Sequence, residues 1–293
     1  MVLIDGKICA TRWKSEISQA VSLLQSESKI TPHLAAILVG NDPASEAYVA
    51  GKVKDCEEVG FHSTLIRFEA TVSQTVLLQK IEEINQNPSI HGLIVQLPLP
   101  KHIDANLVTE TIAPEKDVDG FHPVQVGRMT KNLPAYISAT PLGVLKMLEY
   151  YEIETAGKHC VVIGRSQIVG MPMSILMLRN APQGNCTVTT CHSRTPDLAY
   201  FTRQADILIA AIGIPHFVKA DMVKPQAVVI DVGINRIEDK SKTSGFRLVG
   251  DVDFETVAPI SSHITPVPGG VGLMTRAALL YNTLLAAKLS FHQ

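Results

Sequence analysis

Short apolar runs alternate with amphipathic stretches along the whole chain. The apolar runs are rich in β-branched residues and are bounded by glycine, proline and other turn formers, which predicts strands joined by helices. Strands separated by crossover helices are typical of a mostly parallel sheet in an α/β protein. The predicted strands cover residues 33–39, 63–68, 92–97, 159–163, 187–190, 206–211 and 227–232.

The pattern is interrupted near the middle of the chain, where Pro134, Thr140 and Pro141 precede an apolar helix at 144–151. Thr140 followed by Pro141 is a typical helix start, because threonine is a good N-cap and proline a good first helical residue. We therefore expect a domain boundary at this point.

The length of the chain also favours two domains, because 293 residues exceed the size at which one hydrophobic core usually stops growing. We expect an α/β domain of residues 1–139 and a second, Rossmann-like domain of residues 140–273, with a cleft between them. The last amphipathic helix lies within residues 274–293, and the pattern leaves open which domain it packs on.

Composition and charge favour small-molecule ligands. The formal net charge is -2 at pH 7 and the basic residues form no block, so nothing indicates a nucleic acid or an anionic membrane as a partner. The five cysteines are scattered and include no Cys-x-x-Cys pair, which argues against disulfides and a metal site. No apolar run reaches the ~18 residues of a membrane span and the first residues do not resemble a signal peptide, so we expect a cytoplasmic protein.

A strand, a glycine turn and a helix start follow one another at residues 159–172. The turn begins Gly164-Arg165-Ser166, and Gly170 closes it. Glycines in such a turn let the backbone approach a pyrophosphate, which the N–H groups of the helix N-terminus then bind. Because Ser166 stands where a middle glycine is usual and Gly170 comes one residue late, the pattern is compatible with a dinucleotide site and with a purely structural turn.

The end of the next strand indicates which dinucleotide would bind. In NAD-binding folds an acidic residue about 20 positions after the glycines takes the ribose 2′-hydroxyl. The corresponding segment here, residues 191–195, contains no acid. Ser193, Arg194 and the neighbouring Arg165 suit a 2′-phosphate, because a guanidinium binds phosphate through two parallel hydrogen bonds. This predicts NADP as the cofactor, and a solvated turn is the alternative.

In the first half, a helix predicted to begin after Asp42 carries Ser45, Tyr48 and Lys52 on one face, while Lys54 lies on another. Lys52 is flanked by apolar residues, and an apolar environment lowers the pKa of a lysine because it disfavours the ammonium form. That would make Lys52 a group for acid or base catalysis. The alternative is a surface lysine whose stem lies along the helix while its charge stays in water.

Two further segments place polar groups beside this helix. Gln96 ends an apolar strand, and Asp117 and Asp119 lie in a turn. An amide and carboxylates that face Lys52 would form a polar cluster in an apolar setting, which is typical of a site.

Six motifs resemble those of the bifunctional methylenetetrahydrofolate dehydrogenase/methenyltetrahydrofolate cyclohydrolases, over nearly the whole chain. The motifs are long, and chance agreement of all six is not credible. They are Tyr48-Val-Ala-Gly-Lys52-Val-Lys54, Gly92-Leu-Ile-Val-Gln96-Leu-Pro-Leu-Pro100, Pro114-Glu-Lys-Asp-Val-Asp-Gly120, Val162-Ile-Gly-Arg-Ser166, Val232-Gly-Ile-Asn-Arg236 and Pro266-Val-Pro-Gly-Gly-Val-Gly272.

This resemblance implies a two-domain enzyme, usually a homodimer, that oxidises 5,10-methylenetetrahydrofolate with NADP and hydrolyses the methenyl product. It implies that Lys52 is the catalytic lysine, that Tyr48 orders Lys52 and the folate, that Gln96 hydrogen-bonds Lys52, and that Asp119 holds the pterin.

For the second domain, the resemblance implies that Gly164, Arg165 and Ser166 bind the dinucleotide. Ser193 would contact the 2′-phosphate region, and the backbone of Ile234 would bind the nicotinamide amide.

The chain departs from the family pattern at three places. Leu273 replaces a proline, Ala139 stands where a cysteine is frequent, and the loop at 181–185 is slightly longer. These departures concern loop geometry and leave the catalytic positions intact.

Two other functions are compatible with parts of the pattern. Tyr48-x-x-x-Lys52 is also the catalytic pair of short-chain dehydrogenases, but in that family the glycine turn precedes the pair, whereas here it follows. A non-catalytic folate or nucleotide-binding module is the second alternative, and it would not need the lysine.

Overall fold

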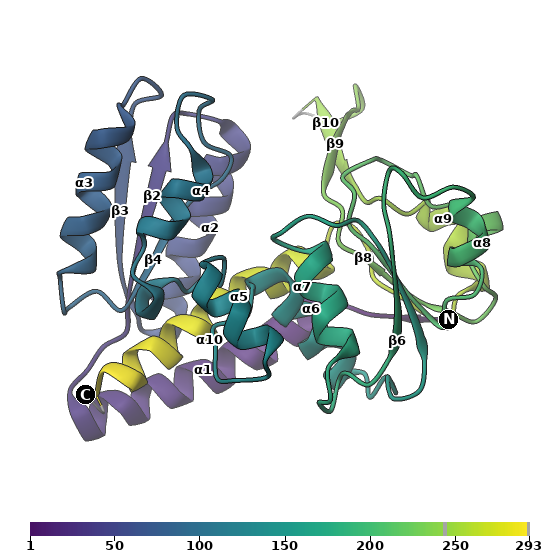
Figure 1. Ribbon diagram of the computed structural model, residues 1–293, viewed down its shortest axis with the longest axis horizontal. Coiled ribbons are helices and arrows are strands. Elements are labelled where there is room, and N and C mark those ends of the chain that lie inside the picture. Colours follow the sequence, from purple (N-terminus) through teal and green to yellow (C-terminus); the bar gives the residue numbers. More distant parts are fainter. Residues whose placement is uncertain (243–244, 292–293) are drawn as a thin grey trace. The chain divides into compact units, whose positions relative to one another are not determined.

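The computed structural model describes residues 1–242 and 245–291, and it divides into two compact units (Figure 1). Unit 1 comprises Met1–Ala10 and Thr140–Thr275, and unit 2 comprises Thr11–Ala139 and Arg276–Gln293. The chain passes between the units three times: inside helix α1 (Gly6–Ser28), at the start of helix α6 (Ala139–Tyr150) and inside helix α10 (Val271–Phe291). Among the described residues, no helix combines the length and apolar character needed to cross a membrane.

The units differ from the expected domains at the two ends of the chain. The first ten residues lie in unit 1, because β1 (Val2–Leu3) pairs in parallel with β11 (His263–Ile264). The last helix lies in unit 2 from Arg276 onward, and the rings of Trp13 and Tyr281 pack there at 5.4 Å between centroids.

A three-stranded parallel sheet in the order β3-β2-β4 forms the centre of unit 2. Its register sets Ala36 beside Leu65 on one side and Ile94 on the other. The elements of this unit are β2 (His33–Val39), α2 (Pro43–Val59), β3 (His62–Phe68), α3 (Gln74–Asn85), β4 (Gly92–Val95), α4 (Ala105–Thr111), the 3-10 helix η1 (Pro114–Lys116) and α5 (Pro123–Thr130).

Both faces of strand β2 are covered by helices. Ile37 and Val39 share a core with Leu77 and Ile81 of α3, and α2 packs against β2 and β3. Figure 1 shows α3 and α2 on opposite sides of these strands. Burial on both faces explains why the strand is an unbroken apolar run without polar alternation.

Helix α2 begins and ends at strong local signals. The Asp42 carboxylate accepts a hydrogen bond from the Ser45 N–H at 2.8 Å, and Pro43 is the first helical residue. Gly60 ends the helix with φ at 84°, a conformation that glycine adopts without steric cost. These signals fix the helix that carries Tyr48 and Lys52.

A six-stranded sheet in the order β1-β11-β8-β7-β5-β6 forms the centre of unit 1, and all its strand pairs are parallel. A separate antiparallel pair joins β9 to β10. The further elements of this unit are α6 (Ala139–Tyr150), β5 (His159–Ile163), α7 (Gly170–Leu178), β6 (Thr187–Cys191), α8 (Leu198–Thr202), β7 (Ile207–Ala210), η2 (Ala220–Met222), β8 (Val228–Asp231), β9 (Asn235–Glu238), β10 (Phe246–Val249), α9 (Phe254–Val257) and η3 (Ala258–Ile260).

The α/β fold class and every predicted strand are confirmed, with end positions that differ by up to two residues. One local prediction is wrong. Helix α6 begins at Ala139, so Thr140 lies inside its first turn and is not the residue before the helix. The Thr140 hydroxyl instead lies 3.0 Å from the hydroxyl of Thr275.

Candidate active site

The polar cluster predicted in the first half forms in unit 2 around Lys52. The Lys52 ammonium donates a hydrogen bond to Gln96 Oε1 at 3.2 Å, and its Nζ lies 4.9 Å from the centre of the Tyr48 ring. Only 6% of Lys52 is exposed, whereas Lys54 is exposed. The structure therefore excludes a surface role for Lys52.

Burial governs the electrostatics of the cluster. It lowers the pKa of Lys52 below its usual 10.5, because desolvation disfavours the ammonium form, and the nearby Asp119 carboxylate partly offsets this. Burial also raises the pKa of Asp119, which the charge of Lys52 opposes. A lysine with a lowered pKa, bonded to an uncharged amide, can exchange protons nearer to neutral pH than a free lysine.

Gln96 is itself held in place by the main chain. Its backbone N–H donates to Ile37 O at 2.9 Å, which continues the β2–β4 ladder, and its side-chain Nε2 donates to Leu97 O at 2.7 Å. The second bond orients the amide so that Oε1 is the atom presented to Lys52.

Charged side chains fix helix α2 from the side opposite to solvent. Asp55 is buried and pairs with Lys14 of α1 at 3.3 Å and with Arg276 of α10 at 2.9 Å. A methyl group on Gly51 would collide with the Arg276 guanidinium, so the glycine beside Lys52 permits this pairing.

Asp117 is not part of the cluster, although the sequence prediction grouped it with Asp119. Its carboxylate accepts a hydrogen bond from the His122 N–H at 2.7 Å and is buried. It therefore supports the turn that carries Asp119.

The glycine turn in unit 1 brings backbone segments close together at both of its ends. Gly164 adopts φ of 122°, and a methyl group there would collide with Ala211 O, while one on Gly170 would collide with Gly164 O. The Ser166 hydroxyl accepts hydrogen bonds from the N–H groups of Val169 and Gly170 at 3.2 and 3.3 Å. This gives a local role to the serine at the middle position, because its hydroxyl holds the turn that leads into helix α7.

The other residues predicted to bind the dinucleotide lie at the surface of unit 1. Arg165, Ser193 and Ile234 are exposed and follow β5, β6 and β8. In parallel sheets these strand ends share one edge, where open α/β sheets bind ligands. The glycines at both ends of the turn, the exposed Arg165 and the absence of an acid from residues 191–195 fit a phosphorylated dinucleotide.

The sequence analysis missed two buried carboxylates beside these residues, Asp231 and Asp251, which are 3% and 0% exposed. The available signal was a glycine near each aspartate in the chain. A methyl group on Gly233 would collide with the Asp251 carboxylate, and one on Gly250 would collide with the Asp231 carboxylate.

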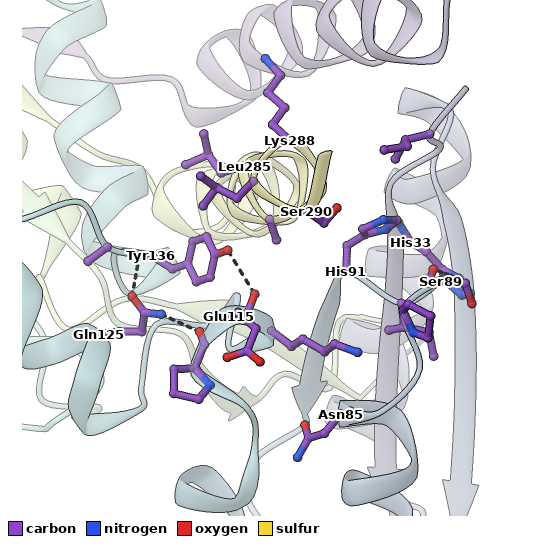
Figure 2. Close-up of a pocket in the computed structure, with 18 of the residues that line it drawn as sticks. His33, Asn85, Ser89, His91, Glu115, Gln125, Tyr136, Leu285, Lys288 and Ser290 are labelled. Carbon is purple, nitrogen blue, oxygen red and sulfur yellow. Dashed lines mark hydrogen bonds between the residues drawn. The ribbon is translucent and has the colours of Figure 1, made fainter. Parts of the chain in front are cut away.

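A large hollow of about 1800 Å³ in unit 2 lies elsewhere (Figure 2). His33, His62 and His91 line it, and they stand at the amino-terminal ends of β2, β3 and β4. Lys52 and Gln96 do not line it. Gln96 follows the carboxyl-terminal end of β4, and Lys52 lies on α2 and bonds to it. Figure 2 shows the Tyr136 hydroxyl donating to Glu115 O on its wall, at 3.1 Å.

Comparison with known proteins assigns both halves of the chain. Residues 4–119 match the catalytic domain of tetrahydrofolate dehydrogenase/cyclohydrolase, and residues 138–291 match its NAD(P)-binding domain. The chain belongs to this family. The match confirms the resemblance seen in the sequence motifs.

Relatives of this tetrahydrofolate dehydrogenase/cyclohydrolase are similar over their full length. The bifunctional protein FolD of Cytophaga hutchinsonii is 59% identical over 289 residues, which cover 99% of this chain and 100% of the relative. The crystal structure of the bifunctional methylenetetrahydrofolate dehydrogenase/cyclohydrolase FolD from Campylobacter jejuni is 47% identical, with a TM-score of 0.92 and 99% of both chains covered. That of the Trypanosoma brucei enzyme, complexed with NADP and an inhibitor, is 38% identical, with a TM-score of 0.95 and 100% and 99% covered.

Membership in this family makes the protein an oxidoreductase and hydrolase that acts on a folate and binds a pyridine dinucleotide. This supports the folate enzyme over the short-chain dehydrogenase and over the non-catalytic binding module.

Proposed function

We propose that this chain oxidises 5,10-methylenetetrahydrofolate to the 5,10-methenyl form with NADP and then hydrolyses that product to 10-formyltetrahydrofolate. The observation that carries the proposal is the buried Lys52, whose pKa is lowered and whose ammonium is bonded to the neutral amide of Gln96. The solved relatives support it, because one is called a methylenetetrahydrofolate dehydrogenase/cyclohydrolase and another is complexed with NADP.

The oxidation asks mainly for alignment. The hydride leaves a carbon between two nitrogens, whose lone pairs stabilise the cation, so positioning of the folate supplies much of the rate. The bound dinucleotide supplies the hydride acceptor. On this proposal Gly164, Arg165 and Ser166 hold its phosphates, Ser193 contacts the 2′-phosphate region, and the Ile234 backbone binds the carboxamide.

The hydrolysis asks for proton transfers, which Lys52 provides. Its neutral amine takes a proton from the water that attacks the methenyl carbon, and the resulting ammonium gives that proton to the ring nitrogen as the carbon–nitrogen bond breaks. The remaining hydroxyl proton leaves to solvent as the formyl carbonyl forms, so Lys52 returns to its neutral form and one proton is released. Gln96 accepts from Lys52 and fixes the direction of its Nζ. Tyr48 packs its ring against the lysine, and Asp119 holds the pterin.

The assembly and setting proposed for this enzyme are a homodimer in the cytoplasm that supplies one-carbon units, including those for purine biosynthesis. The family resemblance supports these points. No metal ion has a role in the proposed reaction.

Replacing Lys52 by Met tests the proposal, because Met keeps the apolar stem and nearly the volume but lacks the titratable nitrogen. We expect hydrolysis of supplied methenyltetrahydrofolate to fall by about 10²- to 10⁴-fold, the contribution of a positioned acid/base group. The oxidation should fall less, so methenyltetrahydrofolate should accumulate and be visible by its absorbance.

Lys54→Met is the matched control, since Lys54 lies two residues away on the same helix and is exposed. Its hydrolysis rate should stay within about threefold of the native rate, as expected for an exposed side chain away from the chemistry. A folded Lys52→Met protein that hydrolyses methenyltetrahydrofolate at the native rate would exclude Lys52 as the acid/base group.

A further inference from the structure

Two buried carboxylates in unit 1 bind backbone N–H groups. Asp231 is the last residue of β8, and Asp251 follows β10 by two positions. Within residues 1–242 and 245–291, neither carboxylate forms an ion pair with a lysine, arginine or histidine. Backbone N–H groups are therefore the main partners of both carboxylates.

The Asp251 carboxylate lies inside a turn that follows β7. Its Oδ2 accepts from the N–H groups of Ile212 and Gly213 at 2.7 and 3.0 Å, and its Oδ1 accepts from the Ile214 N–H at 2.9 Å. Successive N–H groups that converge on one anion form a nest, whose geometry depends on the anion. Asp251 thus fixes the loop after β7.

The same carboxylate also fixes the loop after β8. Its Oδ1 accepts from Asn235 Nδ2 at 2.9 Å, and Asn235 directly follows Ile234. Gly233, on the other side of Ile234, packs so closely on Asp251 that a methyl group there would collide with the carboxylate. Ile234 is therefore flanked on both sides by residues that contact Asp251.

Asp231 positions Asp251 in turn. Its Oδ1 accepts from the N–H groups of Gly233 and Asp251, and its Oδ2 accepts from the Val252 N–H, each at 2.9 Å. A methyl group on Gly250 would collide with this carboxylate. The two carboxylates thus join the end of β8, the end of β10 and the loop after β7.

The two loops present apolar side chains to solvent. Ile214 and Ile234 are 49% and 54% exposed, although each stands on a loop that Asp251 fixes. Rigid loops that hold isoleucines exposed at the ligand-binding edge of a parallel sheet suit a flat, partly apolar ring.

We propose that Asp251 is a positioning residue for the nicotinamide end of the dinucleotide, because it fixes the loops that carry Ile214 and Ile234. The inference rests on the proposed binding of the nicotinamide at Ile234. Asp251 does not touch the ring, and its effect on hydride transfer passes through these two loops.

Asp251→Asn tests the inference. The carboxylate accepts hydrogen bonds through both oxygens, whereas the amide has one oxygen and an NH₂ group that would face N–H donors and lose those bonds. We expect the NADPH dissociation constant, measured by fluorescence titration, and the KM for NADP each to rise about tenfold or more, as for a lost buried hydrogen bond. The KM for methylenetetrahydrofolate and the hydrolysis of supplied methenyltetrahydrofolate, which needs no dinucleotide, should stay unchanged. A merely structural role would lower the melting temperature and leave the NADP constants of the folded protein intact.

Asn235→Ala is a milder second variant, because it removes one bond to Asp251 and leaves every backbone donor satisfied. It should raise the NADPH dissociation constant by about threefold to tenfold, the range of one net hydrogen bond. Asp253→Asn is the control. This carboxylate lies two residues from Asp251, and among the described residues its ion pair is with the exposed Lys219, at 3.7 Å.

Native NADPH affinity in folded Asp251→Asn and Asn235→Ala proteins overturns the inference, and so does an equal loss of both enzyme activities. A native protein that binds NADPH but oxidises no folate contradicts the proposed function instead, and the titrations still decide the role of Asp251.

Discussion

Lys52 and Lys54 are chemically identical side chains, and one helix gives them opposite environments. Two residues along an α-helix turn a side chain by about 200°, so Lys52 faces the sheet side while Lys54 faces water. Burial lowers the pKa of Lys52, because desolvation disfavours its ammonium form. A residue's chemistry here follows from the face it occupies.

Arg165 is the residue on which we expect the choice between NADP and NAD to depend. It is exposed in the turn after β5, and residues 191–195 at the end of β6 contain no acid to bind a ribose 2′-hydroxyl. Because hydrogen bonds to charged groups contribute roughly 1.5 to 3 kcal/mol, Arg165→Ala should weaken NADP by about tenfold to a hundredfold and leave NAD nearly unaffected. Steady-state kinetics with both cofactors measure this.

Arg203→Ala is the matched control for that experiment. Arg203 is an exposed arginine of the same unit, and within residues 1–242 and 245–291 its side chain donates one hydrogen bond, to Asp221 O. Equal catalytic efficiency with NADP and NAD in the native protein would refute the predicted preference.

At the scale of elements, the turn after η1 contains the buried Asp117, which supports the turn beside Asp119 but is not part of the Lys52 cluster. Hydrogen bonds from the His122, Phe121 and Gly120 N–H groups favour the charged form of Asp117. Burial outweighs them and, with the nearby Asp119, raises the pKa of Asp117 to about 7. Between these two pKa values, Asp117 is protonated in the folded protein and ionised in the unfolded chain, where its pKa is near 3.8.

This proton predicts a pH dependence of folding. The folded state binds more protons than the unfolded state between about pH 4 and about pH 7, so stability falls as pH rises through that window. Relative to Asp117→Asn, the native protein should lose up to about 4 kcal/mol of unfolding free energy across it.

Urea unfolding at several pH values measures the effect, followed by the fluorescence of Trp13, the single tryptophan, which lies in the same unit as Asp117. Parallel pH curves for the two proteins would show that Asp117 does not carry this proton.

At the scale of the whole molecule, the chain's ends are shared between its units. Residues 1–10 add a strand to the sheet of unit 1, whereas Arg276 and Asn282 of α10 belong to unit 2. Asn282 is buried, and its amide donates to Val118 O at 2.8 Å, next to Asp119 in the chain, and to Ile137 O at 2.9 Å, two residues before Ala139. Each unit is thus completed by segments distant in sequence.

The proposed homodimer is a property of this scale and is open to a direct test. Light scattering at micromolar concentration should give about twice the chain mass of 31.8 kDa. A mass equal to that of one chain would contradict it.

The sequence by itself determined the features that local pattern encodes. Buried strands such as 33–39 are apolar runs because helices cover both faces, and helix α2 is marked by Asp42 and Gly60. The spacing of Tyr48 and Lys52 placed them on one face, and the motifs identified the family. The Lys52–Gln96 contact was expected from these patterns.

Only the tertiary structure decided which distant segments meet. The strands β1 and β11 have two residues each, which is too short for an alternation of apolar and polar positions to be recognised. The pattern of an amphipathic helix such as α10 indicates that one of its faces is buried, but it does not indicate which part of the protein covers that face. The sequence marks Asp251 only by the neighbouring Gly250. Its partners could not be predicted, because most of them are backbone N–H groups of a distant loop, and every residue except proline carries one.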